Sequence, residues 1–433
     1  MITRDNIGVF IKNRKGKPLE FASSIMKEQD SYLVCMQQSP TSIAKVAVSV
    51  GESVLEGGQI GRPKDRYGCF VYSPTSGKVV DIIQKMSIYG TMCDHVLIVS
   101  NKKNERFEFP KLDEISRKTI LERLMSSGIL DLSGQPSYIK FVRKPNDKSR
   151  LFISCIDNDP FVSCEEVSFR ENIDVCVKGA ELYMNLINVS TATFVFSSNQ
   201  KSAIKALKKH ISDKKYSFIK IKVIDNVYPL SLNEITRNLS GKYLDDAGRY
   251  KKGIYIESGQ TAKQLYEAVI LGKPVISRLM TIGGNGFIRK ANYEIKNGTS
   301  LRAIMDFVGG NTSVSEYKMI CGGAMTGIAQ ESNDVTVNLV TPAVLFMTQQ
   351  EFCREKETPC ISCGRCVDVC PACIMPNRIE TFLLDGDYDF AKKYGIANCT
   401  GCGACSYVCP ANRYLAQRII DGRDKIASNG GDV

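Results

Sequence analysis

Eight of the 17 cysteines in the chain form two runs of the same spacing near the C-terminus. The first is Cys360-Ile-Ser-Cys363-Gly-Arg-Cys366-Val-Asp-Val-Cys370-Pro, and the second extends from Cys399 to Pro410. Both read C-x2-C-x2-C-x3-C-P, in which three thiolates hold one 4Fe-4S cluster and the fourth holds its neighbour. The spacing therefore predicts two clusters with crossed ligation and a role in electron transfer. The predicted ligands are Cys360, Cys363, Cys366 and Cys409 for cluster 1, and Cys399, Cys402, Cys405 and Cys370 for cluster 2.

Zinc is the alternative metal for these runs. Zinc sites take four ligands in two CxxC-like pairs, however, which is not the pattern of two runs of four that each end in proline. Of the other cysteines, Cys353 and Cys373 stand beside the runs and are expected not to be ligands. The rest are scattered, and most are expected to be buried small apolar residues. They are Cys35, Cys69, Cys93, Cys155, Cys164, Cys176 and Cys321.

The composition excludes several classes of protein. The 433 residues are 43% hydrophobic and 24% charged, as is usual for globular chains, and they contain no nucleic-acid-binding motif. Two histidines, His95 and His210, are too few for a metal site built from three. No apolar run is long enough to span a membrane, and the charged N-terminus does not resemble a secretory signal. We therefore expect a cytoplasmic protein. Its formal charge of +11 could suit an acidic donor or anionic lipid, although solvated lysine-rich faces are the simpler explanation.

Four regions of different pattern must position these cysteines. Residues 1–110 contain short strands broken by Gly and Pro, which predicts a small barrel or sandwich. Residues 112–330 alternate amphipathic helices, such as 115–125 and 200–211, with apolar strands, which predicts an α/β layer. A small β-containing module is expected near 275–315, where the Gly-rich stretch 283–286 is interpreted as a structural turn. Residues 346–433 change to short helices, which favours an α-helical ferredoxin module.

The order of these motifs resembles the RnfC family, the peripheral subunits of the ion-translocating ferredoxin:NAD oxidoreductase complex. The second run with the following Pro-Ala-Asn-Arg is similar to the family's "CSYVCP" end, and Tyr317–Gly327 to its "GGPMMG" segment. Residues 286–299 resemble its soluble ligand-binding β-grasp (SLBB) module. Residues 56–80 resemble its barrel-sandwich domain, which is akin to biotinyl and lipoyl carriers; Lys78 lacks the expected hairpin-tip context and is interpreted as unmodified.

The resemblance implies a multidomain α/β and β fold. Residues 1–110 would be the barrel-sandwich hybrid and 111–260 a Rossmann-like α/β domain of the type in the NADH-binding subunit of complex I. Residues 261–345 would be the SLBB-like β-grasp, and 346–433 the two-cluster helical ferredoxin. It also implies an electron-transfer subunit that works with other subunits, especially a ferredoxin-like iron–sulfur subunit. Such a subunit would meet the inner face of the cell membrane only through its partners.

The flavin and nicotinamide site of the family is where this chain departs most. The family's Gly-rich "GLGGAGFP" loop, whose bare amides cradle phosphate, corresponds here to residues 128–140, where only one glycine of that loop survives. Its "NAAECEP" segment corresponds to Ser154–Pro160, which has shorter carboxylates. Lys140 and Lys144 could replace the lost amides by charge. The residues that would bind FMN or NAD(H) are Gly134, Lys140, Asp157, Asn158 and Asp159.

Three functional hypotheses remain open from the sequence. In the first, the chain passes electrons between a nicotinamide or flavin and iron–sulfur partners, as a subunit of an ion-translocating ferredoxin:NAD oxidoreductase. In the second, the nucleotide site has decayed, and an RnfC-derived adaptor feeds a dedicated reductase of the proline-reductase or cobalamin-reductase type. A purely structural role for the clusters is a third hypothesis. Whether the chain is an enzyme by itself stays undecided, because no side chain is expected to make or break bonds.

Overall fold

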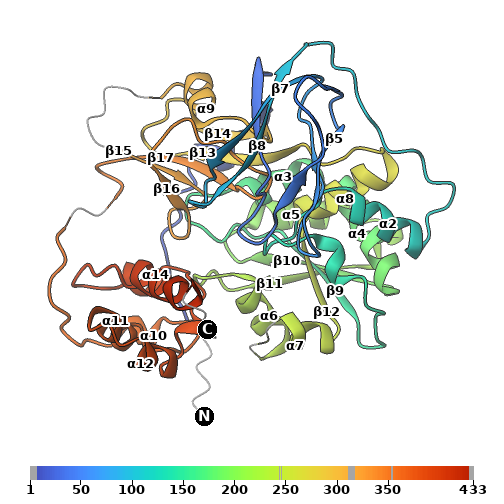
Figure 1. Ribbon diagram of the computed structural model, residues 1–433. Coiled ribbons are helices and arrows are strands. Elements are labelled where there is room, and N and C mark those ends of the chain that lie inside the picture. The colour runs from blue at the N-terminus through green and yellow to red at the C-terminus, as the bar shows by residue number, and fades with distance from the viewer. Residues whose placement is uncertain (1–6, 243, 245, 311–316, 353–354, 429–433) are drawn as a thin grey trace.

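The computed structural model describes residues 7–242, 244, 246–310, 317–352 and 355–428. It has three parts built around sheets and a helical C-terminal part, which occur in this order along the chain (Figure 1). A multidomain α/β protein was predicted, and this is confirmed. Among the described residues, no helix is both long and apolar enough to cross a membrane.

The N-terminal part is a small β-barrel made of two antiparallel sheets, in the orders β2-β8-β7-β4 and β3-β5-β6. Val34, Ile60 and Val96 are fully buried between them. The short β1 strand precedes the barrel but pairs with β14 of another sheet. The elements are α1 (Lys17–Glu20), β1 (Ser24–Ile25), β2 (Ser31–Cys35), β3 (Ala44–Val46), β4 (Ser53–Val54), β5 (Gln59–Pro63), β6 (Val71–Tyr72), β7 (Gly77–Met86) and β8 (Met92–Ser100).

The central part is a parallel sheet of order β11-β10-β9-β12 with helices on both faces. One face packs against α2, α4, α5 and α8, and the other against α6. The elements are α2 (Arg117–Ser126), η1 (Ser137–Lys140), β9 (Arg150–Ser154), α3 (Cys164–Glu171), α4 (Ile173–Ile187), β10 (Ala192–Ser197), α5 (Lys201–His210), η2 (Lys214–Tyr216), β11 (Ile219–Ile224), α6 (Leu232–Ser240), α7 (Asp246–Lys251), β12 (Ile254–Ser258) and α8 (Gly259–Ile270).

The helix expected over 115–125 begins later than its apolar pattern suggests. Ser116 caps it, because its side chain accepts a hydrogen bond from the Thr119 amide while the Thr119 side chain binds back to the Ser116 amide. This capping box ends the preceding segment, so Ile115 lies outside the helix and is 49% exposed.

The third part is a mixed six-stranded sheet of order β1-β14-β13-β17-β15-β16, with α9 packed on it. Residues 283–286 turn the chain after β13, as predicted. Gly284 there has φ +89°, and the backbone of Phe346 leaves no room for a side chain. The assignment of this part to the SLBB class and the domain boundaries remain predictions. The elements are β13 (Ser277–Gly283), β14 (Ala291–Lys296), α9 (Leu301–Val308), β15 (Tyr317–Cys321), β16 (Ile328–Gln330) and β17 (Ala343–Thr348).

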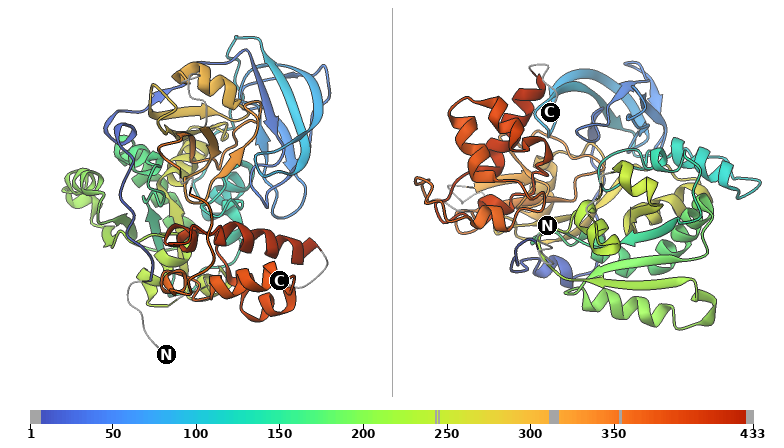
Figure 2. Two further views of the ribbon diagram at one scale, coloured as in Figure 1. Left: turned by 90° about the vertical axis from the view of Figure 1, so that its left-hand side faces the viewer. Right: turned by 90° about the horizontal axis from the view of Figure 1, so that it is seen from below.

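The C-terminal part consists of short helices that form a separate unit beside the central part (Figure 2). Within the described residues 355–428 there is no strand, so the expected helical ferredoxin module is confirmed over the described span. The elements are α10 (Arg365–Asp368), α11 (Pro376–Leu384), α12 (Tyr388–Lys393), η3 (Ile396–Asn398), α13 (Ala404–Tyr407) and α14 (Leu415–Ser428).

Candidate electron-transfer and cofactor sites

The eight cysteines of the two runs gather around two small pockets. The grouping is crosswise, because each pocket takes three cysteines from one run and the last cysteine of the other. Cys360, Cys363, Cys366 and Cys409 line the first pocket, and Cys370, Cys399, Cys402 and Cys405 line the second. Each pocket thus has the donor set that a 4Fe-4S cluster requires. We call the first group the outer quartet and the second the inner quartet.

A structural repeat of 39 residues produces this arrangement. Gly364 and Gly403 both have φ +77° and stand before the equivalent one-turn helices α10 and α13. Ser362 and Gly401, which precede them by two residues, also adopt positive φ. Because each run folds back in the same way, its first three thiols converge on one pocket, while α10 and α13 pack against each other. The fourth cysteine, beyond each short helix, then reaches the neighbouring pocket.

Backbone amides also point at the sulfur atoms. The amides of Gly401, Ala404 and Ser406 donate to the thiols of Cys399, Cys402 and Cys405 respectively. In the outer quartet, the Ser362 amide lies 3.4 Å from the Cys360 sulfur. Such N–H···S bonds stabilise thiolate ligands and adjust the potential of a bound cluster. The residues present therefore fit a pair of iron–sulfur clusters.

The two quartets differ in what surrounds them. In the outer quartet, Cys360 and Cys363 are exposed, and Ile361 between them is 67% exposed. The inner quartet lies against the body of the protein: the Tyr228 hydroxyl donates to the Cys402 carbonyl oxygen at 2.5 Å. A Cβ atom added at Gly403 would lie 2.7 Å from the Met325 carbonyl oxygen. One quartet therefore faces solvent, and the other faces the central and third parts.

Ion pairs hold the segment before the first run onto the helices. The Glu380 side chain, which is 2% exposed, accepts from Arg413 Nε at 2.6 Å and also pairs with Arg418. Arg418 reaches Glu357 at 2.6 Å, and Arg413 lines the outer pocket. This network ties the approach to Cys360 to α11 and α14. Cys373 lies outside both pockets and is exposed, and Cys353 is outside the described residues.

A cavity of about 350 Å³ lies at the carboxyl edge of the parallel sheet, where cofactors bind in open α/β folds. It is lined by the loop that follows β9, by the end of β12 and the first turns of α8, by the loop at Gly134 and by the segment around Gly323. Of the predicted nucleotide-site residues, Gly134, Asp157, Asn158 and Asp159 line this cavity. Lys140 is not among its lining residues.

The loop that replaces the family's Gly-rich loop is hydrogen-bonded to itself. Asp131 Oδ1 accepts from the amides of Ser133 (2.8 Å) and Gln135 (3.1 Å) and from the Ser133 hydroxyl. The Gly134 amide donates to the Asp131 carbonyl oxygen, and the Gly134 carbonyl oxygen accepts from Ser39 Oγ at 2.6 Å. These amides are the ones a phosphate would need, and an internal carboxylate or carbonyl already occupies them.

Lys140 is the centre of a buried ion-pair triad. Its ammonium lies 2.8 Å from Asp131 and 2.9 Å from Glu257, and all three side chains are almost fully buried. Burial opposes ionisation of Asp131, but the charge of Lys140 outweighs it and lowers the pKa of Asp131. The lysine therefore neutralises carboxylates of the fold. Lys144, the other lysine near this loop in the sequence, is exposed.

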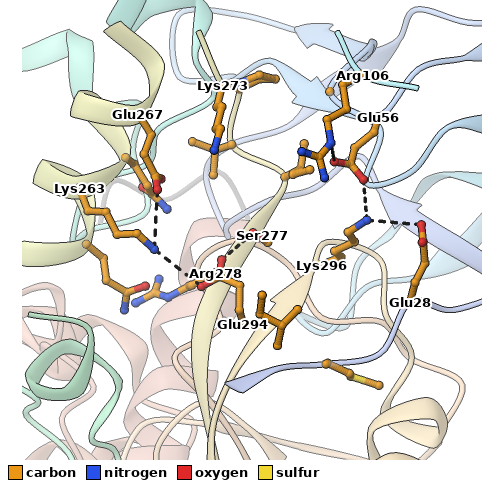
Figure 3. Close-up of a pocket in the computed structure, with 18 of the residues that line it drawn as sticks. Glu28, Glu56, Arg106, Lys263, Glu267, Lys273, Ser277, Arg278, Glu294 and Lys296 are labelled. Carbon is orange, nitrogen blue, oxygen red and sulfur yellow. Dashed lines mark hydrogen bonds and ion pairs between the residues drawn. The ribbon is translucent and has the colours of Figure 1, made fainter. Parts of the chain in front are cut away.

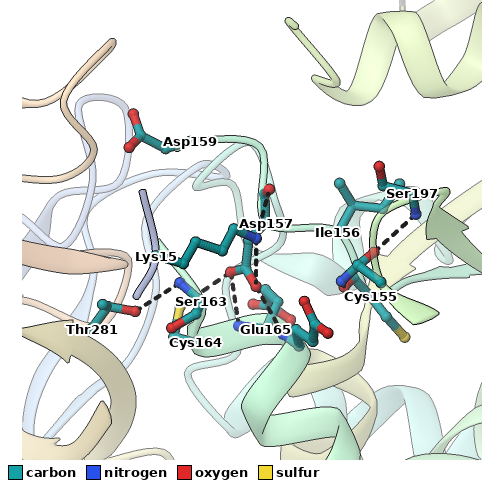
Figure 4. A network of polar contacts seen from close by, with 12 residues as sticks. Lys15, Cys155, Ile156, Asp157, Asp159, Ser163, Cys164, Glu165, Ser197 and Thr281 are labelled. Carbon is teal, nitrogen blue, oxygen red and sulfur yellow. Dashed lines mark hydrogen bonds and ion pairs between the residues drawn. The ribbon is translucent and has the colours of Figure 1, made fainter. Parts of the chain in front are cut away.

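Asp157 fills the N-terminus of α3. Its two carboxylate oxygens accept from the amides of Glu165 and Glu166, both at 2.9 Å, and the buried Lys15 ammonium lies 3.8 Å away. Figure 4 shows Asp157 pointing at the helix and at Lys15, with Asp159 turned away from both. A helix N-terminus is a natural anion site, and here the anion is the protein's own.

Asp159 and Asn158 connect the cavity with the C-terminal part. The Asp159 carboxylate accepts from the amides of Phe161 (3.0 Å) and Met325 (2.9 Å), and burial raises its pKa. Met325 is also the residue whose carbonyl oxygen faces Gly403. Asn158 accepts from the Leu230 amide. The sequence pattern offered no sign of this bridge from the cavity to the inner quartet.

The cavity does not fit a flavin phosphate. Among its described lining residues the charged groups are Asp131, Asp157, Asp159, Glu165 and a single cation, Arg278. Arg278 is already paired with Glu165 at 3.3 Å. Burial raises the pKa of Glu165 to about 7, in spite of Arg278. A phosphate here would meet carboxylates, and the amides and cations that could hold it are engaged.

A second, larger cleft of about 660 Å³ lies between the barrel, α8 and β14. Its charges are mostly paired (Figure 3): Lys296 lies 2.7 Å from Glu56, and Arg106 lies 2.9 Å from the same carboxylate. Lys263 bridges Glu267 and Glu294 at 3.9 Å each. The cleft thus joins three parts of the molecule through ion pairs.

In comparisons with known proteins, three segments of the chain match known domain families. The RnfC barrel sandwich hybrid domain matches residues 6–103, the Nuo51 FMN-binding domain matches 124–267, and the 4Fe-4S dicluster domain matches 359–413. One subunit of the proton-translocating ferredoxin:NAD(+) oxidoreductase complex of Clostridium ljungdahlii is 29% identical, over 94% of this chain and 90% of that protein. Both comparisons thus show a similarity of this chain to the RnfC family. The predicted resemblance is confirmed.

Other relatives are similarly distant. The relative from the ion-translocating oxidoreductase complex of Rhodobacter capsulatus is 28% identical, over 90% of this chain and 77% of that protein. A structural likeness to a chain of NAD+-reducing [NiFe]-hydrogenase in the H2-reduced state covers 72% of this chain and 61% of that one. Its TM-score is 0.47 at 12% identity. The dicluster match confirms the predicted 4Fe-4S cofactors as a class.

Proposed function

We propose that this RnfC-like chain is an electron-transfer subunit of an ion-translocating ferredoxin:NAD oxidoreductase complex. Electrons would pass through two 4Fe-4S clusters, one held by the outer quartet and one by the inner quartet. The observation that carries the proposal is the crosswise gathering of eight cysteines into two groups of four. The relatives of similar length are subunits of such complexes, which supports the same setting here.

The surroundings of the quartets suggest an order of transfer. The inner cluster would exchange electrons with the outer cluster and with a donor that docks beside the body of the protein, where Tyr228 and Met325 contact the inner loop. The outer cluster would exchange them with a ferredoxin-like iron–sulfur subunit, because its ligand loop is exposed at Ile361. Through such partners the chain would lie on the inner face of the cell membrane.

Crossed ligation can be tested by pairing substitutions. Cys409→Ser should alter the same cluster as Cys360→Ser, although the two residues belong to different runs, and should leave the cluster altered by Cys405→Ser intact. Anaerobic redox titrations followed by EPR distinguish the two clusters by potential and spin coupling. If Cys409→Ser instead alters the cluster that Cys405→Ser alters, the assignment is wrong.

A second candidate function is favoured by one observation, the internal hydrogen bonding of the loop at Gly134. An RnfC-derived adaptor without a nucleotide site would take electrons from a partner protein and feed a dedicated reductase, of the proline-reductase or cobalamin-reductase type. Flavin content and an NADH titration of anaerobic protein separate the two functions. Bound FMN with rapid cluster reduction by NADH would rule out the adaptor. Absence of both would rule out a nicotinamide entry site.

A further inference from the structure

Three side chains that can bind metal converge on the barrel, far from the cluster runs in sequence. Cys35 ends β2, and Cys93 and His95 lie on the neighbouring strand β8. The antiparallel register pairs Cys35 directly with His95. Cys93 precedes His95 by two residues, so strand alternation puts all three on one face of the sheet.

The distances between the donor atoms are short. Cys35 Sγ and Cys93 Sγ are 3.3 Å apart, and Cys93 Sγ lies 4.0 Å from His95 Nδ1. One donor atom from each of the three residues lies within 4.8 Å of the others. Around a tetrahedral zinc ion, two thiolate sulfurs lie about 3.8 Å apart and a sulfur and a nitrogen about 3.6 Å. The Cys35–Cys93 and Cys93–His95 separations are thus within about half an ångström of this geometry.

The position of this trio in the fold favours a specific site over a chance surface cluster. Val34 and Val96 point to the barrel core, so the trio occupies the opposite face. Cys35 and His95 are nevertheless buried, because the third part of the molecule packs here, where the Leu33 amide donates to the Gly298 carbonyl oxygen. Cys93 is only half-buried, which leaves one ligand within reach of solvent.

We propose that Cys35, Cys93 and His95 form a zinc site with two sulfur ligands and one nitrogen ligand. Thiolate with imidazole is a ligand set that zinc prefers, and the fourth position would hold water. His95 Nδ1 lies 3.0 Å from the Cys93 carbonyl oxygen. Either Nδ1 leaves this contact to bind zinc, or it donates to the carbonyl while Nε2 binds, as outer-sphere partners of zinc-bound histidines do. The ion would tie β2 to β8 where the barrel meets the third part.

Zinc analysis of the intact protein tests this site. Anaerobically purified protein with both clusters is given one equivalent of zinc sulfate and passed through gel filtration. We expect about one zinc per chain in the wild type. Cys93→Ser and His95→Asn should lose it with iron content unchanged. Cys69→Ser, which removes another buried thiol of the same barrel, should keep it.

X-ray absorption at the zinc edge counts the sulfur ligands of the bound zinc, so it distinguishes this site from zinc bound by the cluster cysteines without any variant. Two sulfur ligands with nitrogen or oxygen support the site, whereas four sulfur ligands contradict it. No retained zinc in the wild type, or zinc retained equally by Cys93→Ser and His95→Asn, overturns the proposal. So does a Cys35–Cys93 disulfide-linked peptide in the purified protein. None of these outcomes depends on the electron-transfer function.

Discussion

Glu165 is a carboxyl whose burial makes its charge unfavourable. Burial raises its pKa from the ordinary 4.5 to about 7, although Arg278 lies 3.3 Å away. The folded state therefore holds a proton that the unfolded chain releases. A raised carboxyl pKa contributes stability below about pH 4.5, and this contribution is lost as pH rises toward 7.

Glu165→Gln should remove that pH dependence. Gln resembles the protonated acid, so near pH 5 the stabilities of the variant and the wild type should differ by less than about 1 kcal/mol. At pH 8 the variant should gain about 3 kcal/mol relative to the wild type, the equivalent of the pKa shift. Because the chain has no tryptophan, urea midpoints are followed by far-UV CD at both pH values. If the difference in urea midpoint between the variant and the wild type is the same at both pH values, the pKa of Glu165 is not raised.

Gly403 and Gly364 are equivalent in the repeat but not in their surroundings. Both have φ +77°, so alanine at either position carries the same backbone strain, about 1 kcal/mol. Only at Gly403 does the new Cβ meet the Met325 carbonyl oxygen, at 2.7 Å, and around Gly364 there is nothing within 4 Å. Gly403→Ala should push the inner loop from the body and lower iron toward about half, with Gly364→Ala as the matched control. Equal iron content in Gly403→Ala and Gly364→Ala would show that the contact with Met325 does not hold the inner loop.

At the scale of elements, local patterns were predictable and distant contacts were not. The second run repeats the first after 39 residues, and each run contains the glycine that makes its turn, Gly364 or Gly403. The helical module and the grouping of the cysteines therefore followed from the spacing. By contrast, Tyr228 meets Cys402 across 174 residues, and β1 pairs with β14, which follows the whole central part in the chain. Asp157 was expected near a cofactor, but whether it caps a helix depends on where α3 begins.

The buried carboxylate of Glu380 ties α11 to α14 and to the nearby Arg413 through ion pairs. Its side chain is 2% exposed and pairs with both Arg413 and Arg418. Glu380→Gln leaves Arg413 and Arg418 without this partner, and losing a hydrogen bond to a charged group costs about 1.5–3 kcal/mol. The variant should lose visible cluster absorbance at a lower urea concentration than the wild type. Asp334→Asn, in the exposed pair with Arg302, should cost at most about 1 kcal/mol; equal sensitivity of the two variants would contradict a special role for Glu380.

For the whole molecule, the orientation of the C-terminal part decides which cluster a partner can reach. Electron transfer between proteins requires close approach of the cofactors, and only the outer quartet presents its ligand loop to solvent. The side chain at the tip of that loop is Ile361, which is 67% exposed. A partner that accepts electrons from the outer cluster would cover this residue, since exposed apolar side chains mark contact surfaces more often than charged ones.

Ile361→Glu should therefore slow electron exchange with a partner while leaving the clusters intact. A buried charge at an interface weakens docking, so the second-order rate with a purified two-cluster ferredoxin should fall by about tenfold or more in stopped-flow experiments. Reduction by dithionite, which needs no docking, should be unchanged. Ile288→Glu, at an equally exposed isoleucine (69%) on the third part, is the matched control and should react like the wild type. If Ile361→Glu reacts as fast as Ile288→Glu, the partner reaches the clusters by another face, and the inner quartet becomes the exit.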